Sequence, residues 1–202
     1  MRNTLDSDNS FAGDTHNHFL EHQIVLATLE EHCIEKIEEI ALLMATVLQG
    51  GGTIFWCGNG GSAADSQHFA AELVGRFNRD RPALRSVALT TDSSTLTCVA
   101  NDFSFEDIFS RQIQALGRRG DLLVGISTSG NSPNVLRAFE AGKTGGLHSV
   151  GLLGKSGGKA RALVDHALVV PSDSTARIQE MHVLVGHCLC DRVEMLLGFG
   201  GS

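Results

Sequence analysis

The sequence lacks three features that would direct it to a membrane, to export or to nucleic acid. No apolar stretch approaches about 18 residues, the length that a membrane span needs. The first 15 residues are polar and acidic, without the basic start and apolar centre of a signal peptide. A net charge of −7 offers no general surface to nucleic acid or anionic lipid. We therefore expect a cytoplasmic protein without nucleic-acid or membrane partners.

Cysteine is scarce as well: the chain has 5, an odd number, with no C-x-x-C pair among them. Most of them lie in apolar runs, which favours reduced, buried thiols over a disulfide framework. The chain does have 202 residues of which 42% are hydrophobic, enough for one buried core and too few for two comfortable domains. We expect a frayed tail over residues 1–15 and one domain over residues 16–202.

A long amphipathic helix is predicted near the N-terminus, where apolar side chains recur at steps of three and four. The stripe consists of Leu26, Leu29, Cys33, Ile37, Ile40, Met44 and Val47. It ends at Gly50, Gly51 and Gly52, a strong helix stop. Such a helix ahead of an α/β core either packs against another subunit or covers its own sheet, and the sequence leaves both open.

After these glycines, short apolar segments alternate with helical patterns. Strands are predicted over residues 53–57, 85–89, 121–126, 148–153 and 166–170, and helices over residues 62–77, 134–143 and 175–197. Continuous apolar strands alternating with helices are typical of a parallel sheet covered on both faces. We expect a flavodoxin-like three-layer αβα sandwich with a five-stranded parallel sheet, which binds its ligand at the carboxyl edge of the sheet.

Two loops that follow predicted strands suit a phosphate group. The first, Gly58-Asn59-Gly60-Gly61-Ser62, lets the backbone approach a ligand because glycine has no Cβ, and Ser62 can cap the following helix. The second, Ser127-Thr128-Ser129-Gly130-Asn131-Ser132, offers four hydroxyl groups before a helix start, where free N–H groups favour an anion. Either loop alone is compatible with an ordinary turn and helix cap. Two of them at one sheet edge favour a phosphate monoester site.

A dinucleotide site is the competing interpretation. Gly58, Gly60 and Ala63 fit the G-x-G-x-x-A fingerprint formally, and Asp92 follows the second predicted strand. The fingerprint alone is weak, and it gives no role to the Ser/Thr-rich loop. We therefore favour a phosphosugar over a nucleotide.

Acid/base and metal candidates lie on two predicted helices. His68 and Glu72 are four residues apart, so their side chains share one helix face, a spacing that suits a metal pair, an oriented base or a solvated surface pair. On the final helix His187 lies beside an apolar stripe, where a hydrogen-bonded core histidine is the more ordinary interpretation. Gln179 and His187 are eight residues apart, about 12 Å of rise, so they share a ligand only if Gln179 lies at a frayed first turn.

Five motifs then stand in order along the chain: Gly58-Asn59-Gly60-Gly61-Ser62-Ala63-Ala64, Gln67-His68-Phe69-Ala70-Ala71-Glu72-Leu73, Ala100-Asn101-Asp102, Ser127-Thr128-Ser129-Gly130-Asn131-Ser132 and Ala176-Arg177-Ile178-Gln179-Glu180-Met181-His182. Together they resemble the sedoheptulose-7-phosphate isomerases (phosphoheptose isomerases) of the sugar-isomerase (SIS) domain superfamily. The resemblance covers nearly the whole chain from about residue 16. It implies a SIS domain that converts sedoheptulose 7-phosphate to D-glycero-D-manno-heptose 7-phosphate, the first step toward the nucleotide-activated heptose of bacterial lipopolysaccharide core. It also implies a homotetramer with active sites between subunits.

The resemblance implies roles for individual residues too. Glu72 and His187 would form the acid/base pair. Zinc, one ion per subunit, would bind His68, Glu72, Gln179 and His187. Substrate would contact Asn59, Gly60, Gly61, Ser62, Glu72, Asn101, Asp102, Ser127, Thr128, Ser129, Ser132 and Gln179.

One close relative within this superfamily is not an enzyme but binds the bacterial replication initiator, and it is the alternative for this chain. That relative lacks acid/base residues at the positions of Glu72 and His187, and it carries a bulky arginine where this chain has Ser129. The isomerase is therefore favoured. Ala176 departs from the family pattern, because some family enzymes carry an acidic residue there.

Overall fold

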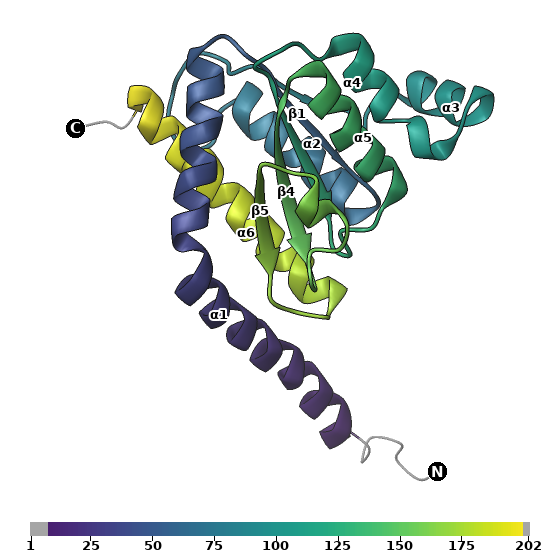
Figure 1. The fold of residues 1–202 in the computed structure, drawn as a ribbon. Coiled ribbons are helices and arrows are strands. Elements are labelled where there is room, and N and C mark those ends of the chain that lie inside the picture. The colour runs from purple at the N-terminus through teal and green to yellow at the C-terminus, as the bar shows by residue number, and fades with distance from the viewer. Residues whose placement is uncertain (1–7, 200–202) are drawn as a thin grey trace, which may run out of the picture.

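The structure is a computed structural model that describes residues 8–199, and from residue 13 their side chains. At its centre is a sheet of five parallel strands in the order β2-β1-β3-β4-β5 (Figure 1). The strands are β1 (Ile54–Gly58), β2 (Ser86–Ala88), β3 (Leu122–Ser127), β4 (His148–Gly154) and β5 (His166–Val170). The predicted five-stranded parallel sheet is confirmed, and every strand end lies within one residue of its expected position.

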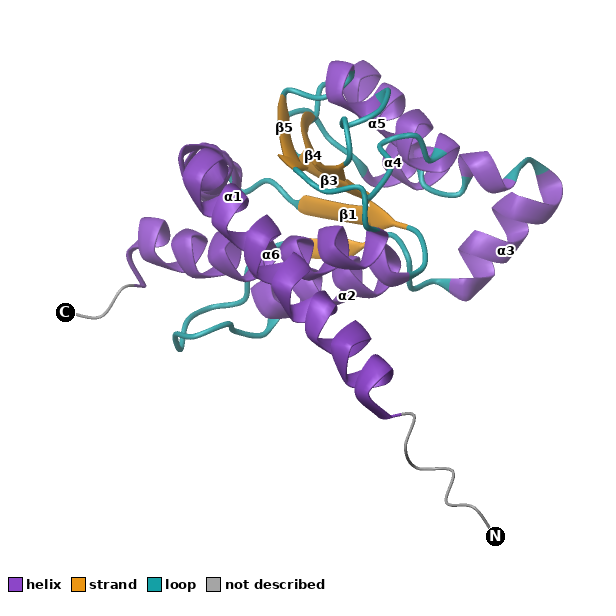
Figure 2. Cartoon of the chain, turned by 90° about the horizontal axis from the view of Figure 1, so that it is seen from below, coloured by secondary structure: helices purple, strands orange, loops and turns teal. Residues whose placement is uncertain are grey.

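Helices cover both faces of this sheet. They are α1 (Asp8–Gln49), α2 (Gly61–Val74), α3 (Ser93–Asp102), α4 (Ser110–Leu116), α5 (Pro133–Gly145) and α6 (Thr175–Glu194), with short turns η1 (Phe105–Asp107), η2 (Ala160–Ala162) and η3 (Met195–Phe199). Seen from below, α1, α2 and α6 lie on one face, and α4 and α5 lie on the other (Figure 2). The three-layer sandwich is therefore confirmed. None of the helices within residues 8–199 combines the length and apolar content that a membrane span needs.

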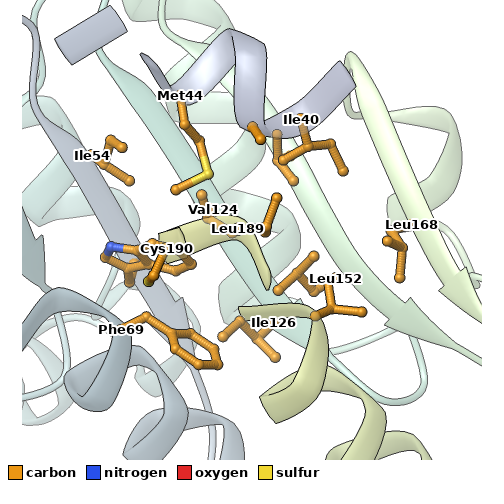
Figure 3. Packing of buried hydrophobic residues seen from close by; sticks show 14 of the residues in the cluster. Ile40, Met44, Ile54, Phe69, Val124, Ile126, Leu152, Leu168, Leu189 and Cys190 are labelled. Atoms are coloured by element: carbon orange, nitrogen blue, oxygen red, sulfur yellow. The ribbon is translucent and has the colours of Figure 1, made fainter. Parts of the chain in front are cut away.

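Strand side chains alternate between two cores, as the period of two in a β-strand requires. On β1, Ile54 and Trp56 point toward α1, α2 and α6, whereas Phe55 and Cys57 point toward α4 and α5. Figure 3 shows part of the first core, where Met44 of α1 and Leu189 of α6 meet the sheet. Burial on both faces explains why the strands are continuously apolar in the sequence.

The strand order positions the ligand site. The chain leaves β1 toward β2 on one side and returns at β3 on the other, which makes the β1/β3 boundary the point where strand order reverses, the usual ligand site of such sheets. Gly58 at the end of β1 pairs with Ile126 near the end of β3. The two phosphate-type loops therefore begin side by side at the carboxyl edge.

Helices α2 and α6 lie side by side on the same sheet face. Their contact depends on Gly186, because a Cβ at this position would overlap the ring of Phe69. Close approach of two helices at a glycine lets side chains on both sides of the contact meet. One such pair is His68 of α2 and His187 of α6, whose rings are 4.9 Å apart between centroids.

Three predictions about the helices were incomplete or wrong. Helix α1 begins at Asp8, so residues 8–15 of the expected tail are helical, while residues 1–7 lie outside the described part. Helix extension is cheap once a long helix exists. Helices α3 and α4 were not predicted, because α3 buries only Val99 and α4 has only 7 residues. The last helix is α-helical to Glu194 and then continues as a π-helical turn.

Candidate active site

The first loop connects β1 to α2 through a glycine with a positive φ angle. Gly60 is the N-cap of α2 at φ 57°, a backbone conformation that favours glycine. The prediction that Ser62 caps this helix is wrong: no side chain caps α2, and the Ser62 side chain is buried against Gly58. In the first turn of α2 the N–H groups of Ser62 and Ala63 instead donate to the backbone carbonyls of Asn59 and Gly60, each at 3.0 Å.

The second loop is ordered by its own hydroxyl groups. Ser127 Oγ lies 3.0 Å from Ser132 Oγ and accepts a hydrogen bond of 3.1 Å from the Gly130 N–H. Ser129 Oγ accepts from the Asn131 N–H at 3.1 Å, and Thr128 is half-buried between these groups. Ser132 is the N-cap residue of α5 but makes no side-chain cap bond; its hydroxyl pairs with that of Ser127 instead.

An asparagine pair joins the two loops. Asn59 in the first loop and Asn134 in the first turn of α5 exchange two side-chain hydrogen bonds, each of 2.8 Å. Sequence reasoning missed Asn134, because nothing local marks an asparagine after Pro133 as a long-range partner. The pair therefore ties the first phosphate loop to the helix start that directly follows the second.

Three acid/base candidates from two helices, α2 and α6, converge at one point. His68 Nε2 lies 3.1 Å from Glu72 Oε1 and 3.1 Å from His187 Nε2. One ligand atom from each residue lies within 4.8 Å of the other two. The His68 side chain is 41% exposed and that of Glu72 25%, so a small molecule can reach them. His68 and Glu72 are therefore not an isolated surface pair, and His187 is not simply a core histidine.

Proton accounting at His68 shows that this cluster fits a cation. One imidazole nitrogen carries either one proton or one lone pair, yet His68 Nε2 faces both a carboxylate oxygen and another imidazole nitrogen. A proton on it serves one neighbour only, and a lone pair leaves it facing Glu72 without a donor. Two imidazole nitrogens and a carboxylate oxygen are the donor set that Zn²⁺ binds in proteins. A metal among them would accept all three lone pairs.

The imidazole of His187 is enclosed by aromatic rings. It stacks on Phe77, with centroids 5.2 Å apart and planes at 28°, and meets Phe69 edge to face at 6.3 Å. Sequence reasoning missed Phe77, which lies beyond the end of α2 in a loop without a motif. These contacts restrict the rotation of the ring that faces His68.

The fourth predicted zinc ligand lies elsewhere. The amide nitrogen of Gln179 would be 2.5 Å from a Cβ placed on Gly61, so this side chain lies against the first residue of α2. Gly61 precedes His68 by about 10 Å along the helix axis. The structure thus brings together three of the four predicted metal ligands and places Gln179 beside the first phosphate loop.

Asn101 and Asp102 also lie apart from the cluster. They end α3, which lies at the edge of the molecule away from α6 in both views (Figures 1 and 2). Both are exposed, and Asn101 donates to Asp102 at 2.8 Å. This bond and one from the Cys98 thiol lower the pKa of Asp102. Asp102 is therefore not part of the group formed by His68, Glu72 and His187.

Asp92, the acidic residue that a dinucleotide site would need, is engaged in capping a helix. Asp92 caps α3, accepting from the Thr95 N–H at 3.0 Å and the Thr95 hydroxyl at 2.9 Å. Both bonds lower the pKa of Asp92. A carboxylate engaged at a helix start is not presented to a ribose, which agrees with the preference for a phosphosugar.

Comparison with known proteins gives the same family from sequence and from structure. Residues 18–154 match the SIS domain family. The phosphoheptose isomerase of Paramagnetospirillum magneticum is 55% identical over 174 residues, covering 86% of this chain and 91% of the relative. That of Sulfurimonas denitrificans is 52% identical over 164 residues, covering 81% and 84%. The solved phosphoheptose isomerase of Neisseria gonorrhoeae has a TM-score of 0.87 and 45% identity, covering 92% of this chain and 99% of that chain. The chain belongs to the phosphoheptose isomerase family of SIS-domain proteins.

Proposed function

We propose that this chain isomerises sedoheptulose 7-phosphate to D-glycero-D-manno-heptose 7-phosphate. The observation that carries the proposal is the convergence of His68, Glu72 and His187 on two helices, one of which, α2, begins at the first phosphate-type loop. The product is the precursor of the nucleotide-activated heptose of lipopolysaccharide core. The substrate carries a charged phosphate that does not cross a bilayer unaided, so the proposal includes a cytoplasmic location.

Aldose–ketose isomerisation moves a proton between C1 and C2 through an enediol, which needs a base at the carbon and an acid at the oxygens. Glu72 shuttles the carbon proton, and His187 serves the oxygens. The phosphate is held by backbone N–H groups and hydroxyls, so that binding energy remote from the reacting carbons orients the sugar. These contacts come from Asn59, Gly60, Gly61, Ser127, Thr128, Ser129 and Ser132, with Ser62 and Gln179 as further predicted contacts.

We include one zinc ion per subunit, bound by His68, Glu72 and His187. The support is the position of His68 Nε2 between Glu72 Oε1 and His187 Nε2, because one nitrogen cannot form a hydrogen bond with both in the same protonation state. Gln179 stays a predicted fourth ligand. When bound, the ion would polarise substrate oxygens as a Lewis acid. A lone pair of Glu72 or His187 given to the ion is withdrawn from proton transfer, so the two roles compete.

We also propose a homotetramer in which a second subunit completes each site. Helix α1 extends beyond the core and exposes apolar side chains, among them Phe19 at 64%, Ile24 at 67% and Leu42 at 58% (Figure 1). Apolar side chains in such number along one helix favour burial against a partner. A second copy would also supply Asn101 and Asp102, which lie away from the cluster of their own chain.

The test is a coupled assay of the purified protein with several ketose phosphates, before and after chelation and with added zinc. Glu72→Gln should keep the fold and phosphosugar binding while kcat falls by about 100-fold or more. Glu140→Gln, at an exposed position of α5, is the matched control and should retain full turnover. Near-normal turnover in Glu72→Gln would refute the assignment. Full activity after exhaustive chelation would exclude an obligatory catalytic metal.

The alternative function, binding of the replication initiator, predicts a different result when the same purified protein is assayed. A non-catalytic SIS-domain protein would isomerise none of the sugar phosphates and would bind the replication initiator. The presence of both Glu72 and His187 in one cluster favours the isomerase.

A further inference from the structure

We propose that Glu194 and Phe77 are positioning residues for the isomerisation. They hold the His187 ring in place on the side that stacks on Phe77. This inference rests on the proposed function. Glu194, the last residue of α6, has no exposed side-chain surface. Its carboxylate accepts from three consecutive backbone N–H groups, those of Phe77 at 3.0 Å, Asn78 at 3.1 Å and Arg79 at 3.0 Å. A carboxylate from one helix thus fixes the loop that follows another.

Arg81 completes this clamp and extends it to Glu72. Its side chain has no exposed surface, and its Nε donates to Glu194 at 3.0 Å. The other guanidinium nitrogens donate to the carbonyls of Leu73 and Glu72, each at 2.8 Å. These are carbonyls of the last turns of α2, which a helix end leaves without internal partners. The buried ion pair therefore anchors the turn that carries Glu72.

Phe77 connects the clamp to His187. Its backbone N–H is bound by Glu194, and its ring stacks on the His187 imidazole at 5.2 Å. Phe77 also borders an apolar hollow of about 400 Å³ between α1 and α6, which includes Ile34 and Ile37. One side of the ring thus borders open space, so the anchored backbone of Phe77 helps to keep the ring against His187.

The charge on Glu194 is maintained in the folded protein. Burial by itself raises the pKa of this carboxyl group, but the N–H groups of Phe77, Asn78 and Arg79 and the charge of Arg81 lower it overall. A buried ion pair contributes little net stability compared with packed apolar side chains. Its connection to the turn of Glu72 and to the ring beside His187 therefore favours a positioning role over a purely stabilising one.

The experiment compares Phe77→Leu, Phe77→Tyr and Glu194→Gln with the unchanged full-length protein at equal measured zinc content. Phe77→Leu and Glu194→Gln should each lower kcat by about 10-fold or more, because small misplacements of catalytic groups have large effects on rate. KM should change by less than about 3-fold, since the phosphate loops lie outside the clamp. Phe77→Tyr, which keeps the aromatic face, should restore kcat.

A second readout does not depend on activity. In protein labelled with ¹³C-histidine, the His187 ring signals are assigned by their loss in His187→Gln. Stacking on Phe77 shifts these signals upfield, so Phe77→Leu and Glu194→Gln should move them downfield and Phe77→Tyr should not. Phe139→Leu, a buried position on the opposite sheet face, is the control for a lost phenyl ring and should leave them unmoved.

Unchanged His187 signals and kcat in folded Phe77→Leu protein would overturn the proposal. If Glu194→Gln does not fold, the two Phe77 variants decide the matter, because neither removes a buried charge. If the unchanged protein isomerises no sugar phosphate, the proposed function fails. In that case the His187 ring signals alone test the contact between Phe77 and His187. Signals that do not move in Phe77→Leu would overturn that contact.

Discussion

Asn59 and Asn134 exchange two side-chain hydrogen bonds across the β1/β3 boundary. Each amide donates to the carbonyl oxygen of the other, so the loop after β1 and the start of α5 are fixed as one unit. The phosphate site proposed above is thus built from segments 75 residues apart in the sequence.

Asn134→Leu should weaken substrate binding. The substitution leaves the Asn59 amide without its partner, a cost of about 1–3 kcal/mol for a half-buried polar group. We expect KM to rise about 10-fold, equivalent to about 1.4 kcal/mol, while kcat stays within about 3-fold. Steady-state kinetics check this, with Thr144→Ala, an exposed substitution on the same helix, as the control. An unchanged KM would show that the two loops act independently.

Gly186→Ala should separate the two helices that carry the catalytic candidates. The new methyl group would overlap the Phe69 ring, and overpacking of this kind costs about 1–3 kcal/mol. Because His187 follows directly on α6, it should move away from His68, and turnover should fall more than the loss of stability explains. Melting temperature and kcat measured together test this. A variant with normal kcat would mean that the cluster tolerates a wider helix spacing.

His182 should make the protein less stable in mild acid. Its ring is fully buried, its Nε2 donates to the Leu153 carbonyl at 3.0 Å, and burial lowers its pKa to about 4, although the Leu153 bond opposes this. Between pH 4 and the ordinary pKa of about 6.5, the unfolded chain therefore binds more protons than the folded one. Stability should fall as pH drops through this window, by about 2 kcal/mol at pH 5.

Urea unfolding of the protein and of His182→Gln between pH 4 and 7.5 measures that dependence. The variant is expected to be less stable at pH 7 but to lose less stability on acidification. His32→Gln, at an exposed position of α1, should retain the original slope. Equal slopes for His182→Gln and the unchanged protein would contradict the assignment.

Ile24→Glu should reduce the size of the assembly. Ile24 is 67% exposed on α1 within one chain, and burying a new carboxylate in an apolar interface is unfavourable. Light scattering of the purified variant should give a smaller mass than that of the unchanged protein. Leu116→Glu, a 52% exposed apolar position on α4, should leave the mass unchanged. No change in either variant would exclude this part of α1 from the interface.

Most of the sheet and both loops could be predicted from sequence, because their information is local. Runs of apolar residues mark buried strands, and the glycine and serine clusters at Gly58 and Ser127 mark the strand ends. The spacing of His68 and Glu72 marks a shared helix face in the same way. Family resemblance added the roles of residues such as Gln179, which periodicity does not provide.

Contacts between distant segments could not be predicted. The meeting of His68 with His187 depends on how closely α2 approaches α6, which the fit of Gly186 against Phe69 determines. Helices α3 and α4 escaped notice because α3 has one buried residue and α4 only 7 residues in all. The stacking of Phe77 on His187 depends on a carboxylate 117 residues later, at Glu194.

Because α2 and α6 run side by side, the site should tolerate insertions and deletions in surface loops better than in these two helices. Gly61 lies against Gln179 and Phe69 against Gly186, and just beyond the end of α2 the Phe77 N–H is bound by Glu194. The two helices therefore stay in register along α2. Deleting one residue between Gln179 and His187 would turn the imidazole by about 100° around its axis and remove it from the cluster. Residues gained or lost in the surface loops between β2 and β5, apart from the phosphate loop of residues 127–132, would leave this register untouched. Natural length variation in related chains should therefore collect in those loops and be absent from both helices.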